Sequence, residues 1–278
     1  MTMWVANSAM AGRAAGPFPA YPRTRITAAY AAGSADLPGA GAQLSLFGGF
    51  ELRVGGVKVV LPAHAQRVLA YLALHRMTAP ECGRRVLAER LWENSSPDRS
   101  SASLRTALWR IRRAGPALLG GDAERVRLTD QVEVDVDRFR RRAEDLLAGC
   151  AGPAANAHEL CTAAELLPGW DEDWLVLFRE QLRLLRLHTL EAVARKDCAL
   201  GRYPQAIDLI LRVVAEEPLR ESAQAILIDA HLGEGNAAEA RRQFDLFAAT
   251  LWRELALRPS AELGRRAGVR ECSATTRR

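Results

Sequence analysis

The clearest pattern of hydrophobic and polar positions lies between residues 97 and 114. Four apolar residues recur there at the spacing i, i+3, i+4 and i+7, namely Leu104, Ala107, Leu108 and Ile111. This spacing places them on one face of a helix, where they can pack against a core. Ser96 followed by Pro97 favours a helix start at this point, and Gly115 followed by Pro116 favours its end.

The opposite face of this predicted helix is basic. Arg105, Trp109, Arg110 and Arg113 are expected to point away from the core, with Arg112 at the edge of that face. A basic helix face is more often a solvated surface than a nucleic-acid site, so the neighbouring elements decide between the two.

Two further helices are predicted upstream. Residues 84–92 predict a short helix with Val86, Leu87 and Leu91 facing inward, and a polar turn at 93–96 joins it to the basic helix. Residues 65–75 predict an earlier helix whose inward residues are Val68, Leu69, Leu72 and Ala73. Two amphipathic helices joined by a short turn, with the second one basic, are typical of a helix-turn-helix, whose second helix enters the major groove.

Strand patterns lie on both sides of these helices. Residues 44–47, 50–54 and 57–61 are separated by pairs of glycines and predict a small antiparallel sheet. Residues 125–128 and 132–136 alternate in hydrophobicity around a three-residue turn and predict a β-hairpin. A sheet, three helices and a hairpin together indicate a winged helix.

From Asp137 onward the chain is predicted to be almost wholly helical, with an internal repeat. Gly201 and Gly235 are separated by 34 residues, as are Ala206 and Ala240, and this is the period of tetratricopeptide repeats. The predicted helices span 182–200, 203–216, 220–232 and 237–255. Their expected core residues are Leu185, Leu190, Val193, Ile207, Ile210, Val213, Ile226, Leu227, Phe244 and Phe247.

Length and composition fit two domains and a fold that is mainly α with a small β component. The chain has 278 residues, of which 49% are hydrophobic. We expect a winged helix-turn-helix domain at 43–136 and an all-α, tetratricopeptide-like repeat domain at 137–263. Residues 1–42 lack the apolar core of a signal peptide and are expected to be a disordered leader, and 264–278 a disordered basic tail.

The charge distribution separates these two predicted domains. Residues 43–136 hold 14 basic and 10 acidic residues, a net charge of +4, whereas 137–262 hold 16 basic and 21 acidic residues, a net charge of −5. Phosphates attract arginine and lysine whatever the base sequence, so this difference favours phosphate contacts by the first domain alone.

Several classes of protein are disfavoured. The five cysteines include no Cys-x-x-Cys pair, and His158 and Cys161 lack a second pair at metal-ligand spacing, so we expect no metal and no disulfide framework. Motifs of nucleotide-binding loops, hydrolases and metalloproteases are missing, so we predict no cofactor and no enzyme. No apolar stretch is long enough to span a membrane, so no membrane contact is expected. The scattered cysteines favour a reduced, cytoplasmic protein, which would be nucleoid-associated when bound to DNA.

Two sets of short strings carry a resemblance to a known family. In the first part of the chain they are Leu44-Ser45-Leu46-Phe47-Gly48, Leu91-Trp92, Leu104-Arg105, Ile111-Arg112-Arg113 and Val134-Asp135-Val136-Asp137-Arg138-Phe139. Downstream they are Leu167-Pro168-Gly169-Trp170, Asp173-Trp174, Arg186-Leu187-His188, Glu217-Pro218-Leu219-Arg220-Glu221-Ser222, Glu234-Gly235-Asn236 and Glu254-Leu255. With these strings the chain resembles the SARP family of actinobacterial transcription regulators, in which an OmpR/PhoB-type winged helix is followed by a bacterial transcriptional activator domain (BTAD).

This resemblance implies a regulator that binds double-stranded promoter DNA, as a homodimer on direct repeats, and contacts RNA polymerase to activate transcription. It covers about Leu44 to Leu263. One departure from the family concerns Trp109, because a basic residue often stands at that position. For Trp109 the alternative to the phosphate contact of the family is packing on a sugar or against the turn.

The predicted DNA contacts divide by the part of the DNA that they reach. Arg105 and Arg110 are expected to contact base edges, since a guanidinium can present two donors to guanine in the major groove. The expected phosphate or wing contacts are Arg67, Arg84, Ser101, Ser103, Trp109, Arg112, Arg113, Arg125 and Arg127. The alternative is a non-enzymatic adaptor whose winged helix mediates protein contacts, and salt-dependent affinity for DNA would distinguish the two.

Overall fold

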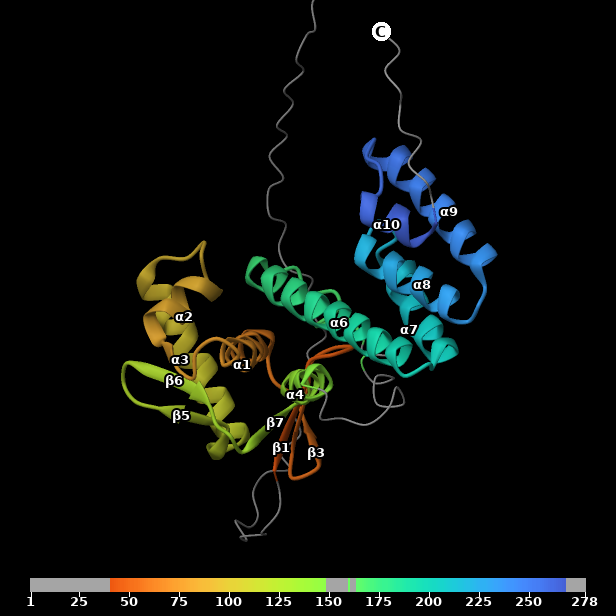
Figure 1. Ribbon diagram of the computed structural model, residues 1–278. Helices are drawn as coiled ribbons and strands as arrows, with labels where there is room; N and C mark the ends of the chain where they lie inside the picture. The colour runs from red at the N-terminus through yellow and green to blue at the C-terminus, as the bar shows by residue number, and fades with distance from the viewer. Residues whose placement is uncertain (1–40, 149–159, 161–163, 269–278) are drawn as a thin grey trace, which may run out of the picture. The chain divides into compact units, whose positions relative to one another are not determined.

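The computed structural model describes residues 41–148, 160 and 164–268, all within one unit of the chain (Figure 1). The protein is mainly helical with a small β component, as the sequence predicts. Residues 1–40 and 269–278, which include most of the expected leader and tail, lie outside the described residues. So do His158 and Cys161.

The first sheet has four strands in the order β3-β2-β1-β7. Their bounds are Ala42–Ser45 for β1, Glu51–Val54 for β2, Val57–Val59 for β3 and Val132–Val134 for β7. Leu44 lies opposite Leu52 in the antiparallel pair of β1 and β2, and opposite Val134 in the parallel pair of β1 and β7. All three side chains are buried, so one face of this sheet contributes to the core.

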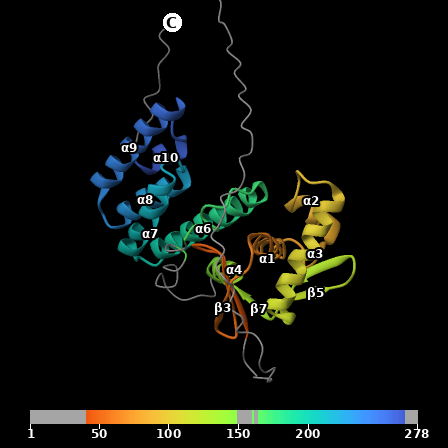
Figure 2. The ribbon, with the colours of Figure 1, turned by 180° about the vertical axis from the view of Figure 1, so that it is seen from behind.

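Three helices follow the sheet: α1 at Ala63–His75, α2 at Arg84–Leu91 and α3 at Pro97–Ala114. Both views show α3 beside α1 and α2, with the strands β5 and β6 next to it (Figure 1, Figure 2). The predicted inward residues of α1 are all buried. In α2 the prediction for Val86 is wrong: this side chain is 57% exposed, because the helix buries the face of Leu87, Ala88 and Leu91 instead.

The predicted hairpin of residues 125–128 and 132–136 is also wrong. β6, Arg125–Leu128, pairs with β4, Cys82–Gly83, and with β5, Leu119–Gly121, which follows the short helix η1 at Pro116–Leu118. β7 instead joins the first sheet. Alternation in hydrophobicity reveals that one face of a strand is buried, but it does not identify the neighbouring strand. The wing is therefore the hairpin of β5 and β6.

The parallel strand β7 leads directly into helix α4, Asp135–Leu147, so the expected strand ends two residues early. The Asp135 carboxylate accepts the backbone N–H groups of Leu46 and Phe47 at 2.8 and 3.0 Å, and that of Val136 at 2.8 Å. Burial raises the pKa of Asp135, while these three donors act in the opposite direction. Asp135 thus fixes the end of β1 to the start of α4.

The second half consists of antiparallel helices. They are α6 at Asp173–Ala199, α7 at Tyr203–Glu216, α8 at Glu221–Gly233, α9 at Ala237–Leu255 and α10 at Ala261–Arg266. Helices α7, α8 and α9 lie at the predicted positions to within one residue, whereas α6 begins nine residues before the predicted start at 182 and α10 was not predicted. Gly201 and Gly235 both have a positive φ, 73° and 81°, at equivalent turns of the two repeats. The helix α10 continues to Arg266, past the point where the basic tail was expected to begin.

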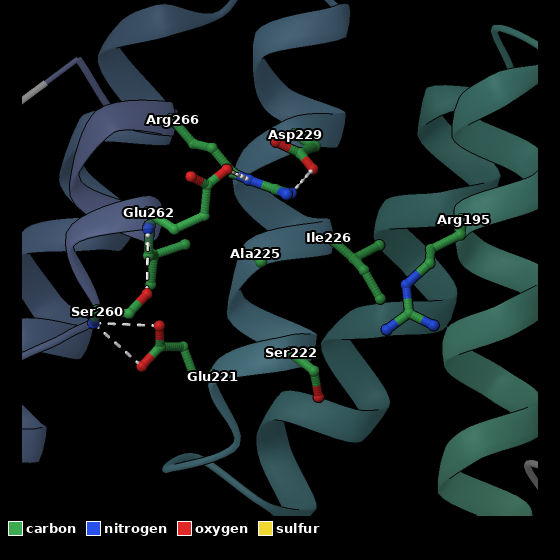
Figure 3. Close-up of a pocket in the computed structure, with 10 residues that line it drawn as sticks. Arg195, Glu221, Ser222, Ala225, Ile226, Asp229, Ser260, Glu262 and Arg266 are labelled. Carbon is green, nitrogen blue, oxygen red and sulfur yellow. Dashed lines mark hydrogen bonds and ion pairs between the residues drawn. The ribbon is translucent and has the colours of Figure 1, made fainter.

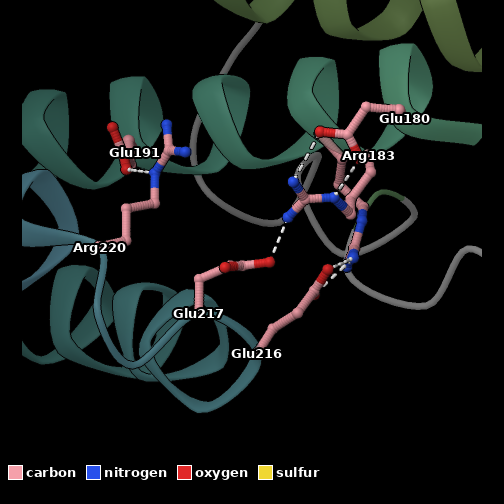
Figure 4. A network of polar contacts seen from close by, with 7 residues as sticks. Glu180, Arg183, Glu191, Glu216, Glu217 and Arg220 are labelled. Carbon is pink, nitrogen blue, oxygen red and sulfur yellow. Dashed lines mark hydrogen bonds and ion pairs between the residues drawn. The ribbon is translucent and has the colours of Figure 1, made fainter. Parts of the chain in front are cut away.

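A buried carboxylate connects α6 to the start of α8. Glu191 is only 3% exposed and accepts a hydrogen bond from Arg220 (Figure 4). It also accepts from the Ser222 hydroxyl at 2.8 Å and from Arg195 at 3.0 Å. Burial raises the pKa of Glu191, but the hydrogen bonds from Arg220 and Ser222 outweigh it, and the net shift is downward. Glu191 is therefore ionised at neutral pH and joins the two repeats.

Further ion pairs run along the same helix. Arg183 pairs with Glu180 one turn away at 2.8 Å and with Glu217 just beyond α7 (Figure 4). Arg186 pairs with Glu216 at the end of α7. Several acidic residues of this half are thus paired with arginines of the neighbouring helix.

Candidate nucleic-acid interface

Helix α3 begins and ends where the sequence predicts. Ser96 is its N-cap, Pro97 its first residue and Gly115 its C-cap, whose N–H donates to the carbonyl of Ile111. The four apolar residues of the predicted stripe are all at most 3% exposed. Because this face is fixed in the core, the rest of α3 is turned toward solvent.

Helix α3 carries five exposed arginines, of which Arg99 lies in the first turn. The other four, Arg105, Arg110, Arg112 and Arg113, lie around Trp109 on the solvent face, and we call them the arginine face. Within the described part of the chain, none of the four forms an ion pair. Trp109 lies among them and is 51% exposed. The guanidinium carbons of Arg110 and Arg113 lie 5.0 and 5.4 Å from the centroid of its ring, within the range of cation–π contacts.

The serines predicted to hold phosphates lie at the start of α3. Ser101 and Ser103 are both partly exposed. Their neighbour Ser100 is buried and its hydroxyl donates to the carbonyl of Pro97 at 3.0 Å. The first turn thus presents two hydroxyl groups beside the arginine face and uses a third for its own stability.

The wing carries its two predicted arginines, but a carboxylate lies next to both. The Arg125 and Arg127 side chains are 65% and 39% exposed, and they lie 3.6 and 3.8 Å from the carboxylate oxygens of Glu81. No local pattern predicts this pairing, because Glu81 lies more than 40 positions upstream and reaches the wing through the pairing of β4 with β6. The loop between the strands is closed by Asp122, which accepts the N–H groups of Glu124 and Arg125, both at 2.8 Å.

The two remaining phosphate candidates are differently placed. Arg67 donates to the carbonyl of Leu91 and to the carboxylate of Glu172, both at 2.7 Å, so its guanidinium is occupied inside the protein and a phosphate contact is not favoured. Arg84 is partly buried at the start of α2, and its backbone N–H donates to the wing carbonyl of Glu124 at 2.8 Å.

Two further residues on or beside this surface, Arg99 of α3 and His64, were not among the predicted contacts. His64, in the first turn of α1, is partly buried, and burial lowers the pKa of its imidazole, to which the charge of Arg110 contributes further. His64 is therefore neutral at pH 7 and adds no competing charge beside Arg110.

A concave surface lies in the repeat domain, between α6, α8 and α10 (Figure 3). Its volume is about 520 Å³, with Ile226 and Leu263 among its apolar residues. Its charged groups largely pair with one another: Arg266 binds Asp229 at 2.8 Å and Glu262 at 3.1 Å. In the part of the chain that the structure describes, no cluster of side chains could hold a metal ion, and no helix is long and apolar enough to cross a membrane.

Residues 134–268 match the family model of the bacterial transcriptional activator domain, BTAD. This match covers 135 of the 278 residues, so the second half of the chain is similar to this family. The chain is also similar to the regulatory protein AfsR of Streptomyces coelicolor: 29% of positions are identical over 167 residues, which cover 55% of this chain and 16% of AfsR. The chain thus spans a small part of this relative.

Among solved structures, EmbR of Mycobacterium tuberculosis, in complex with a low-affinity phosphopeptide, has the same fold. The TM-score is 0.65 at 22% identity, over 82% of this chain and 64% of the EmbR chain. The activator domain, the AfsR match and the EmbR fold together confirm the resemblance to the SARP family, which is a family of transcriptional regulators.

Proposed function

We propose that the chain is a sequence-specific DNA-binding regulator that activates transcription. In this proposal residues 43–136 bind promoter DNA and residues 137–263 form the activator domain. The observation that carries it is the arginine face: four exposed arginines without acidic partners in the described chain, on the second helix of a helix-turn-helix. That helix is the one that enters the major groove in proteins of this architecture.

The proposed roles follow from position along α3. Arg105 and Arg110 reach base edges, where a bidentate contact to guanine discriminates against other bases by about 1–3 kcal/mol. Arg112 and Arg113, in the last turn, bind phosphates, which set the register of the helix but carry no base information. The serines 101 and 103 and the wing arginines 125 and 127 add backbone contacts.

The proposed partners rest on the SARP resemblance and on the match to AfsR, whose name describes a regulatory protein. We propose that the chain binds repeated promoter sites as a homodimer and contacts RNA polymerase through its activator domain. Analytical ultracentrifugation with and without a two-site duplex would measure the dimer, and transcription in vitro with added polymerase would measure activation.

The DNA contacts can be tested by fluorescence anisotropy with a duplex selected from a random library by the wild-type chain. Arg110→Ala should weaken binding by about 1–3 kcal/mol and relax the preference at one base pair. Arg112→Ala should weaken binding to all duplexes alike. Arg212→Ala is the matched control, because Arg212 is an exposed arginine on α7 and should leave affinity unchanged.

Salt titration separates the proposed function from the adaptor alternative. The logarithm of the association constant should fall linearly with the logarithm of salt concentration, and the slope should decrease by about 1 for each phosphate-binding arginine removed. A wild-type chain that binds no duplex at low salt would contradict DNA binding and favour an adaptor.

A further inference from the structure

We propose that Trp109 is a positioning residue that holds Arg110 and Arg113 ready for DNA, and this inference rests on the proposed function. It assigns the exposed indole a role that differs from a contact to DNA. In the free protein the indole is the group that the two guanidinium groups contact, because no carboxylate of the described residues pairs with either arginine.

The position of Trp109 on the helix explains how one ring serves two arginines. Arg105, Trp109 and Arg113 follow at i, i+4 and i+8, so they form one ridge along the solvent face of α3. Arg110 is the next residue in the chain and lies beside this ridge. With Ala107 and Ile111 buried on the opposite face, the backbone fixes the direction of the Trp109 side chain outward.

A fixed aromatic ring beside two arginines restricts the mobility of their side chains and leaves their charge unchanged. An arginine side chain has many rotamers, and ordering it on binding costs free energy. Contact with the indole face restricts those rotamers before DNA arrives, so less ordering remains to be done in the complex.

If Trp109 acts through the arginines, the loss of DNA affinity in Trp109→Ala should depend on the presence of Arg110 and Arg113. A direct contact of the indole with DNA would show no such dependence. Trp109→Ala should weaken binding to the selected duplex about 5- to 30-fold, because one or two arginine side chains would then have to be ordered on binding. The same change in an Arg110→Ala/Arg113→Ala background should have no further effect. Trp109→Phe, which retains an aromatic face, should recover most of the lost affinity.

Two measurements check the interpretation. The slope of affinity against salt should be the same for Trp109→Ala and wild type, because the number of phosphates neutralised does not change. In the free Trp109→Ala variant, the NMR signals of the Arg110 and Arg113 Nε–H groups should lose the ring-current shifts that they have in the free wild type. Circular dichroism confirms that the variants are folded.

Trp252 provides a matched control. It is also an exposed tryptophan, 58% exposed, with the guanidinium carbon of Arg258 at 6.0 Å from its ring, but it lies on α9 of the repeat domain. Trp252→Ala should therefore not change DNA affinity.

The outcomes are distinguishable. If the wild-type chain binds no duplex, the proposed function is contradicted and Trp109 has no arginines to position for DNA. If the wild type binds and Trp109→Ala binds equally well, only the role of Trp109 is contradicted. If Trp109→Ala weakens binding by the same factor in the absence of both arginines, the indole contacts DNA directly, and the positioning role is overturned.

Discussion

Asp135 allows a stability prediction whose size follows from the structure. Asp135→Ala removes the acceptor of two N–H groups at the end of β1, and Leu46, which carries one of them, has no exposed surface. A buried donor left without an acceptor costs about 1–3 kcal/mol. Loss of the buried carboxylate also relieves the desolvation that raises its pKa. We therefore expect a net loss of about 2–3 kcal/mol at pH 7.

Urea unfolding followed by tryptophan fluorescence measures this loss. With an m-value of about 3 kcal/mol per molar, the midpoint should fall by roughly 1 M urea. Asp135→Asn should lose about half as much, since its amide oxygen can still accept from Leu46 and Phe47. Asp145→Ala is the control, because Asp145 is an exposed carboxylate on the same helix. A midpoint for Asp135→Ala within about 0.2 M of wild type would refute the reasoning.

Three further substitutions probe other parts of the molecule. Gly121→Ala should distort the wing and weaken DNA binding, because φ is +114° and the new Cβ would lie 2.5 Å from a backbone oxygen. Gly120→Ala is its control, because the new Cβ there meets only the flexible side chain of Arg127. Fluorescence anisotropy with both variants measures the difference in DNA affinity. Gly233→Ala should lower the urea midpoint, because its Cβ would lie 2.2 Å from the ring of Tyr203. Glu191→Ala should destabilise the repeats by about 2–4 kcal/mol at pH 7. In a pH series that difference should shrink as the pH falls through the lowered folded pKa, since the contribution of Glu191 is complete only above the unfolded value of 4.5.

Helix positions could be predicted from the sequence because their signals are local. The termini of α3, α7 and α9 agree with the prediction to the residue. In each case a stripe of apolar residues at helical spacing coincides with a proline or glycine at a boundary. The outward direction of Trp109 followed from the same periodicity.

Strand partners could not be predicted, because pairing depends on residues far apart in the chain. β7 pairs with β1, some 90 positions away, and β6 with β4, more than 40 positions away. The strand β5 was missed because it is short and two of its three residues are glycines, which carry no hydrophobic alternation. The same holds for the candidate site. Arg67 is predicted as a phosphate contact because it is a basic residue near a helix start, but its ion pair with the distant Glu172 shows that its side chain is used inside the protein.

The long-range pairs also rank the basic residues of the proposed interface. Arg125 and Arg127 share the carboxylate of Glu81, so a phosphate that approaches the wing must compete with an existing partner. Partly exposed ion pairs of this kind are weak, about 0–1 kcal/mol, and the wing can therefore exchange Glu81 for DNA at small cost. The arginine face has no such competitor among the described residues, and two of its members are already restrained by Trp109. The first contact with DNA should therefore involve α3, with the wing following once the helix is seated in the groove.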